Sequence, residues 1–95
     1  MPEIVTSFIH VKDYVLKVTF EDGLERTIDL EPILIGPLFG ALRNRSLFRQ
    51  VVQDRSFGAL EWPNGADIDP GVLYDWPVHV DAIVERRQQL FAVPA

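Results

Sequence analysis

Apolar side chains recur with a period of two through most of residues 14–30, which leaves this segment little freedom in how it folds. The alternation continues on both sides of a glycine turn at Gly23. A period of two is typical of strands that bury one face and expose the other. The segment therefore predicts two antiparallel strands, with buried faces formed by Tyr14, Leu16, Val18 and Phe20 on one strand and Leu24, Ile28 and Leu30 on the other.

The turn between these strands decides how they pair. A two-residue turn at Asp22-Gly23 would set Leu16 opposite Asp29 and mix buried with exposed faces, which a half-buried sheet disfavours. A three-residue loop over residues 21–23 keeps the faces apart, because it pairs Phe20 with Leu24, Leu16 with Ile28 and Tyr14 with Leu30. We therefore predict a type I turn followed by a bulge, with Gly23 in the left-handed conformation that glycine adopts without strain.

A further strand is predicted ahead of these two, joined to them by a two-residue turn at Lys12-Asp13. This turn would place on the buried face the pairs Val11 with Tyr14, Ile9 with Leu16 and Val5 with Phe20. The opposite face would then carry Ile4, Phe8 and His10, an apolar strip that needs a cover. Either the C-terminal segment or another subunit could provide that cover.

Proline and glycine then interrupt the strand pattern. Residues 38–42 suggest a short helix with Pro37 in its first turn, and Ser46 is a candidate cap for one further turn. A fourth strand at Val51-Val52 and a fifth at residues 59–62 would follow. The expected fold class is α+β: a small antiparallel sheet, made of an N-terminal three-stranded meander plus a second hairpin, with short helices on one side and a C-terminal helix.

Residues 61–74 concentrate polar side chains around a tight turn. Trp62 precedes Pro63 and is therefore expected to be extended, with a packing role favoured over stacking on a ligand. Asn64-Gly65 is a strong turn signal, because both residues tolerate positive φ.

The end of the same stretch predicts a helix start. Asp69 followed by Pro70 matches an N-cap and a first helical position, with the Asp69 carboxylate accepting amide hydrogen bonds. Ile68 would point inward between two acids. Asp67 is the residue least explained: it could satisfy amides of the preceding turn, or face a partner.

One helix is predicted near the C-terminus, where apolar side chains recur at helical spacing. The stripe consists of Val80, Ile83, Val84, Arg87, Leu90 and Phe91. We expect residues 1–75 to form the α+β domain and residues 76–95 to form a helical extension. This extension would pack on its own domain or lie at an interface.

With 95 residues the chain is long enough for one hydrophobic core and too short for two domains. The absence of cysteine removes disulfides and thiolate ligands, as fits a reducing compartment. No apolar run approaches the roughly 18 to 20 residues of a membrane span, and the first residues lack the pattern of a signal peptide. We therefore expect a cytoplasmic protein.

The net charge of −5 disfavours a nucleic-acid backbone as the main partner, because such binding relies on Lys and Arg. A local exception is the basic segment that holds Arg43, Arg45, Arg49 and Arg55. We expect these side chains to form solvated faces and intramolecular pairs, with a recognition patch as the alternative.

No metal, cofactor or small-molecule ligand is expected. The acids do not follow the spacing of a calcium loop, and His10 and His79 are isolated. No serine lies in a nucleophile elbow and no glycine-rich loop matches a phosphate-binding motif. Acid–base catalysis by Glu61 with Asp67 is the weaker alternative, since two nearby carboxylates can differ in proton affinity.

Several short motifs occur in a fixed order. They are Asp13-Tyr14-Val15-Leu16, the hairpin Phe20 to Gly23, the strand Ile28-Asp29-Leu30, the helical region Leu38 to Phe48, and the sequence WPNGADIDP followed by Leu73-Tyr74. In these features the chain resembles the bacterial domain-of-unknown-function family numbered 2442, over about residues 3 to 75. The resemblance implies a small α+β domain without established enzymatic activity, often encoded beside a small partner protein as in toxin–antitoxin pairs. It also implies a signature made of Trp62, Asn64, Gly65, Asp67, Ile68 and Pro70.

Some members of that family carry an appended helix-turn-helix domain, but the segment after Tyr74 has room for one helix only. The leading hypothesis is a non-catalytic protein-interaction module that binds a protein partner or forms a homodimer, with the role of the antitoxin-like member of a two-gene pair as its more specific form. Nucleic-acid binding is the alternative, and it requires the four arginines to form one face. A carboxylate enzyme around Glu61 and Asp67 is the third.

Overall fold

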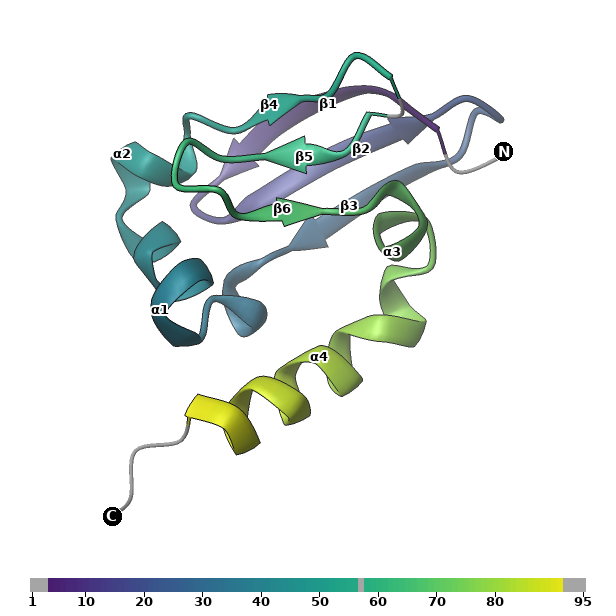
Figure 1. Cartoon of the computed structure of the whole chain (residues 1–95). Helices are drawn as coiled ribbons and strands as arrows, with labels where there is room; N and C mark the ends of the chain where they lie inside the picture. The colour runs from purple at the N-terminus through teal and green to yellow at the C-terminus, as the bar shows by residue number, and fades with distance from the viewer. Residues whose placement is uncertain (1–3, 57, 92–95) are drawn as a thin grey trace.

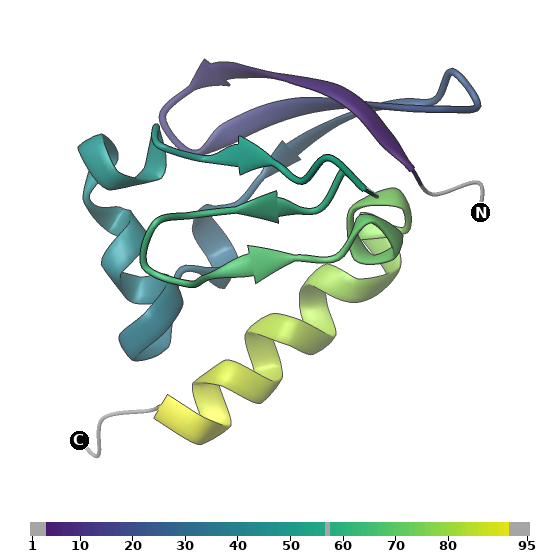
Figure 2. The same ribbon diagram turned by 45° about the horizontal axis from the view of Figure 1, so that its top comes forward.

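The structure is a computed structural model that describes residues 4–56 and 58–91 of the chain. Two three-stranded antiparallel sheets, in the orders β1-β2-β3 and β4-β5-β6, lie one over the other. Short helices close one end of the pair, and a longer helix runs along one side (Figures 1 and 2). The α+β class is thereby confirmed, with the second hairpin extended to a third strand.

The first sheet, sheet A, contains β1 (Val5–Lys12), β2 (Val15–Phe20) and β3 (Glu25–Asp29). Leu16 pairs with Ile28, as the alternation predicts. The Gly23 amide donates to the Phe20 carbonyl over 2.9 Å, and Gly23 has a φ of +91°. The three-residue loop between β2 and β3 is therefore confirmed.

The pairing predicted for β1 is wrong in its middle. The turn lies at Asp13-Tyr14 and not at Lys12-Asp13, so Lys12 pairs with Val15. Bulges between His10 and Lys12 and between Val5 and Ser7 then shift the register, so that His10, and not Ile9, lies opposite Leu16. An extra residue in one strand reverses which side chains face inward. Phe8 packs against the core, whereas Ile9 and Val11 are 59% and 49% exposed. The exposed apolar strip on this strand is thus Ile9 and Val11, and not Ile4, Phe8 and His10.

Four short helical segments follow sheet A: η1 (Glu31–Ile33), α1 (Gly36–Phe39), η2 (Gly40–Arg43) and α2 (Arg45–Phe48). Pro37 lies in the first turn of α1, as predicted. The cap of α2 is Asn44, whose side chain accepts from the Leu47 amide over 3.2 Å. The prediction of Ser46 as this cap is wrong, because Ser46 is already inside the helix.

The second sheet, sheet B, contains β4 (Val52–Gln53), β5 (Leu60–Glu61) and β6 (Asp67–Ile68). Its third strand was not predicted, because two residues are too short for an alternation to be recognised. Beyond it come α3 (Pro70–Tyr74) and α4 (Trp76–Phe91). The inner faces of both sheets contribute to one core, for example through Leu16 of sheet A and Leu60 of sheet B, both fully buried.

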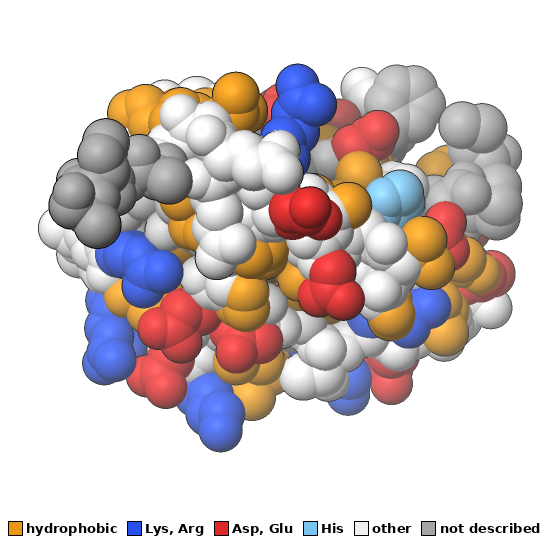
Figure 3. Space-filling view, turned by 90° about the horizontal axis from the view of Figure 1, so that it is seen from below, with side chains coloured by type: hydrophobic (Ala, Val, Ile, Leu, Met, Phe, Trp, Pro, Cys, Tyr) orange, Lys and Arg blue, Asp and Glu red, His pale blue; other side chains and the backbone are white. Residues whose placement is uncertain are grey.

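Helix α4 lies against η1, α1 and α3 of its own chain. The half-buried part of its stripe is Val80, Ile83 and Val84, which pack against the core. Leu90 and Phe91 are 61% and 43% exposed, so the stripe extends beyond the packed part. Figure 3, which views the side where α4 lies, shows apolar side chains interspersed with acidic and basic ones. Within residues 4–56 and 58–91, no helix is long and apolar enough to cross a membrane.

Candidate functional site

Trp62 is a core residue. Its side chain is only 4% exposed, and its indole N–H donates to the Phe48 carbonyl over 2.9 Å. The ring packs against Phe39 and Phe48, with centroid separations of 6.3 and 5.8 Å. These contacts give Trp62 the packing position that the sequence favoured, on the same inner face as Leu60.

The turn after Trp62 has the same hydrogen-bond pattern and the same glycine conformation as the loop at residues 21–23. The Gly65 amide donates to the Trp62 carbonyl over 3.0 Å, and Gly65 has a φ of +92°. Asn64 has no positive φ; instead, its side-chain oxygen accepts from the Ala66 amide over 3.1 Å. The turn is therefore a three-residue loop in which glycine alone takes the left-handed conformation.

Asn64 also joins sheet B to the helical end of the molecule. Its side-chain amide donates to the Leu38 carbonyl in α1 over 2.9 Å. In the equivalent position of the first loop, Asp22 accepts from the Leu24 amide over 2.9 Å. Since Asn64 makes the turn's own hydrogen bond, Asp67 is not needed for it.

Asp69 and Pro70 stand at the predicted helix start. Asp69 is the N-cap residue of α3, and Pro70 is in the first turn. The bonds that open the helix run from the amides of Val72 and Leu73 to the Asp69 backbone carbonyl, over 3.1 and 3.2 Å. The Asp69 side chain makes no capping hydrogen bond, so the prediction of a carboxylate cap is wrong.

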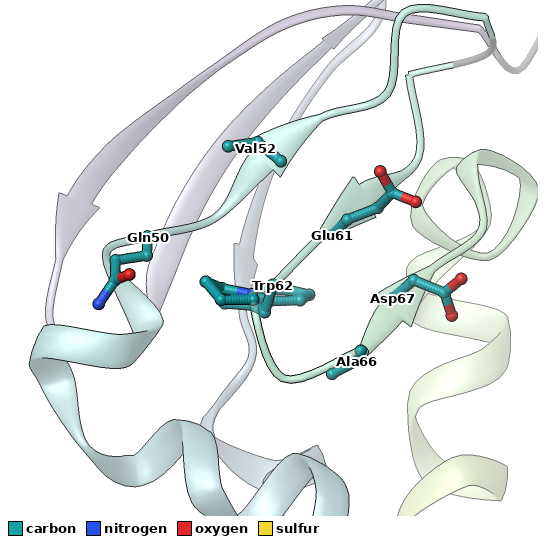
Figure 4. Close-up of a pocket in the computed structure, with 8 residues that line it drawn as sticks. Gln50, Val52, Glu61, Trp62, Ala66 and Asp67 are labelled. Atoms are coloured by element: carbon teal, nitrogen blue, oxygen red, sulfur yellow. The ribbon is translucent and has the colours of Figure 1, made fainter.

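A row of exposed side chains crosses the outer face of sheet B. Val52 pairs with Glu61, and Glu61 pairs with Asp67, so the three side chains lie side by side on three strands (Figure 4). Val52 is 57% exposed, and both acids are exposed as well. Within the described part of the chain, neither carboxylate has a hydrogen bond or an ion pair.

A shallow hollow of about 310 Å³ opens beside this row. Its wall combines the two carboxylates with apolar surface, and it is lined by Gln50, Val52, Glu61, Trp62, Pro63, Gly65, Ala66 and Asp67. Two adjacent carboxylates can accept several hydrogen bonds from a guanidinium or ammonium group, and the apolar wall suits the stem of such a side chain. No group of three candidate metal ligands occurs among the residues that the structure describes.

Sequence reasoning identified Glu61, Trp62 and Asp67 but missed Val52 and Gln50 as their neighbours. Val51 and Val52 are adjacent, and nothing local decides which of them faces inward. The structure buries Val51 and exposes Val52 beside Glu61. The pairing of β4 with β5, which is tertiary information, assembles the hollow.

The four candidate arginines do not form one patch. Arg43 binds the Leu34 carbonyl over 2.9 Å and forms an ion pair with Glu31, and Arg45 pairs with Asp13 over 3.4 Å. Arg49 lies at the end of α2, whereas Arg55 is in the turn between β4 and β5, at the opposite end of β4 (Figure 1). Arg55 therefore lies apart from the three arginines of η2 and α2.

Comparison with known proteins identifies one family. The family model described as "Protein of unknown function (DUF2442)" matches residues 5–79, which include both sheets, the hollow and the start of α4. This match confirms the resemblance and its approximate range. Neither the curated proteins nor the solved structures contain a match to the chain.

Proposed function

The chain belongs to the DUF2442 family, whose description names no activity, and we propose that it is a non-catalytic protein-interaction module. In this proposal it binds a basic segment of a protein partner through the outer face of sheet B. The observation that carries the proposal is the cross-strand pair Glu61 and Asp67, which is exposed and has no cationic partner within residues 4–56 and 58–91.

Like charges directly opposite each other in a sheet destabilise it by up to about 1 kcal/mol. Other acids of the chain are placed differently: Glu25 pairs with Lys17 and Glu31 pairs with Arg43. A Lys or Arg side chain brought by a partner would sit between the two carboxylates and turn their repulsion into attraction. Exposed Val52 beside them offers apolar contact to the same segment.

The finer part of the proposal follows the family resemblance. The partner would be a small protein encoded beside this one, with this chain as the antitoxin-like member of the pair, and both would act in the cytoplasm. A partner of opposite charge suits the net charge of −5.

The test is co-purification of the tagged full-length protein from its native host, with identification of what accompanies it. We compare the wild type with the double variant Glu61→Gln/Asp67→Asn and with a matched control, Asp81→Asn/Glu85→Gln, which removes the same charge from exposed positions of α4. We expect one small basic protein with the wild type and the control, and its loss with the double variant. Repeated recovery of the wild type alone, or undiminished recovery of a partner with the double variant, would contradict the proposal.

The same variants yield a stability prediction. If the two carboxylates repel each other, either Glu61→Gln or Asp67→Asn should raise the free energy of unfolding by about 0.2–1 kcal/mol. The second substitution should then add little, because the first already removes the repulsion. Urea denaturation of the wild type, both single variants and the double variant measures this coupling. If the effects of the two substitutions are additive, or if both single variants are less stable than the wild type, the two carboxylates do not repel each other in the folded protein.

A carboxylate enzyme is the second candidate, because Glu61 and Asp67 border the same hollow. In that case the single amide variants would abolish turnover without weakening the fold. Retention of a partner by these variants, together with loss of an activity, would favour the enzyme over the interaction module.

A further inference from the structure

Asn64 and Gly65 lie in the turn between β5 and β6, and their order in the chain has a chemical consequence. An asparagine followed by glycine is prone to deamidation, because glycine has no side chain to hinder the approach of its own amide nitrogen. That nitrogen attacks the side-chain carbonyl carbon of the asparagine and ammonia leaves. Water then opens the resulting cyclic imide to aspartate or isoaspartate. The chain has two asparagines, and Asn64 is the one that precedes a glycine.

The structure holds both reacting groups in hydrogen bonds. The Gly65 amide donates to the Trp62 carbonyl over 3.0 Å, which engages the proton that must leave before this nitrogen can attack. The Asn64 side-chain oxygen accepts from the Ala66 amide over 3.1 Å. Its side-chain nitrogen, which is the leaving group, donates to the Leu38 carbonyl over 2.9 Å. The Asn64 side chain must rotate away from Leu38 before it can close the ring on Gly65.

The loop at residues 21–23 is the same turn without a bond to α1. The turn glycines have φ values of +91° and +92°, and each glycine amide donates to the carbonyl three residues earlier. The Asp22 side chain accepts from the Leu24 amide over 2.9 Å, in the position where Asn64 accepts within its own turn. A carboxylate at this position is therefore compatible with the turn.

Conversion of Asn64 to an aspartyl residue would keep the turn and break its bond to α1. A carboxylate only accepts hydrogen bonds, so it cannot donate to the Leu38 carbonyl, and the two oxygens repel each other. Leu38 lies in α1, at the helical end of the fold, beside the turn of sheet B (Figure 1). The isoaspartyl product would disturb the turn as well, because it adds a methylene group to the backbone.

We propose that Asn64-Gly65 is a deamidation site that the bond to Leu38 protects, and that its conversion releases the turn of sheet B from α1. The bond controls the reaction because the nitrogen that binds Leu38 is the nitrogen that leaves. Reaction is thereby coupled to opening: it proceeds in molecules in which the turn and α1 have separated, and it makes that separation permanent. The conversion also adds a negative charge between Pro63 and Gly65, which line the hollow.

A second Asn-Gly pair in the same folded protein tests the protection. The full-length double variant Asp22→Asn/Tyr74→Phe creates this pair in the loop at residues 21–23, where it keeps the turn's bond from the Leu24 amide and has neither a bond to α1 nor the Tyr74 hydroxyl. After incubation at mildly alkaline pH, peptide mass spectrometry detects the change in mass from amide to acid. We expect Asn64 to convert at least about tenfold more slowly than the introduced pair.

Unfolding in urea provides the control, since the two pairs should then convert at similar rates. The wild type gives the same comparison without any substitution: urea should accelerate conversion of Asn64 by at least about tenfold. Asn44, which precedes Arg45, should convert slowly in both conditions. Equal rates for the two pairs in the folded double variant, or a rate at Asn64 of the wild type that urea does not raise, would overturn the proposal.

The consequence of conversion is tested with Asn64→Asp, which reproduces the aspartyl product. The matched control is Asn44→Asp at the cap of α2, where the side-chain oxygen accepts from the Leu47 amide and aspartate caps as well as asparagine. We expect Asn64→Asp to lower the midpoint of thermal unfolding by roughly 2–8 °C, and Asn44→Asp to leave it unchanged. Equal midpoints for Asn64→Asp and the wild type would refute the release of α1. Both measurements use the isolated protein, so they are independent of the function proposed for sheet B.

Discussion

At the scale of single residues, Gly65 fixes the turn beside the hollow. A side chain there would meet open space, so its cost is conformational strain alone. We expect Gly65→Val to lower the free energy of unfolding by about 1 kcal/mol or more, because β-branched residues tolerate positive φ poorly.

The matched control for Gly65 is Gly71, which lies in α3 and also has open space at its Cβ position but no positive φ. Gly71→Ala should leave stability unchanged or raise it by up to about 1 kcal/mol, because alanine favours a helix. Thermal or urea unfolding of both variants measures the difference. Equal effects at the two glycines would refute the turn assignment.

Asp22 provides a pH-dependent contact at the same scale. Hydrogen bonds from the Tyr74 hydroxyl and the Leu24 amide hold the pKa of the Asp22 carboxyl below its usual value. A carboxyl whose pKa is lowered by folding stabilises the folded state above its ordinary pKa, and this contribution is lost as the pH falls through the lowered value. The contact between α3 and the loop of residues 21–23 should therefore persist at neutral pH and weaken in acid, below about pH 4.

Removal of the Tyr74 hydroxyl tests this contact. Tyr74→Phe keeps the edge-on packing of the ring against Phe20 and removes the donor. We expect the pKa of Asp22 to rise toward its usual value, as measured by NMR titration of its carboxyl carbon. An unchanged pKa of Asp22 in Tyr74→Phe would show that the Tyr74 hydroxyl does not stabilise the charged Asp22 carboxylate.

At the scale of elements, two helix starts that look alike in sequence are built differently. The Asn44 side chain caps α2, whereas the Asp69 side chain makes no bond at the start of α3. We expect Asn44→Ala to cost about 0.5–2 kcal/mol. Asp69→Ala should cost less than about 0.5 kcal/mol, in the range of an ordinary surface substitution. Chemical denaturation of the two variants measures both losses of stability. A larger loss for Asp69→Ala than for Asn44→Ala would contradict the assigned caps.

The strands show which patterns predict pairing. The loop at residues 21–23 and the alternation around it predicted the register of β2 with β3, because both strands bury one face and the glycine restricts the turn. The alternation in β1 gave the wrong face in its middle, since the turn lies one residue later than predicted and the bulges leave no local signal. Whether the two-residue strands of sheet B form depends on their pairing partners more than on the strand propensity of their own residues.

At the scale of the whole molecule, Arg87 joins α4 to the helical end of the fold. Its guanidinium donates to the Ile33 carbonyl and lies 4.0 Å from the centre of the Phe39 ring. Burial lowers the pKa of Arg87 from its usual value, although an arginine remains charged at neutral pH. The contact therefore combines a charged hydrogen bond with a cation–π interaction.

Arg87→Ala should lower the free energy of unfolding by about 1–3 kcal/mol, through loss of both contacts. The control is Arg86→Ala, one residue earlier and exposed, with an expected change within about 0.5 kcal/mol. Thermal unfolding monitored by far-UV circular dichroism compares the two. Equal effects would mean that α4 is held by its apolar side chains alone.

The sequence by itself determined the α+β class, the β2–β3 hairpin, the helix at Pro37 and the turn at Gly65, because each depends on local periodicity or on the backbone preferences of proline and glycine. It also singled out Glu61 and Asp67. Only the tertiary structure decided that these acids face each other beside Val52, that Arg55 lies apart from the other three arginines, and that β1 exposes Ile9. Those outcomes depend on strand pairing, bulges and contacts between distant segments, for which neighbouring residues carry no signal.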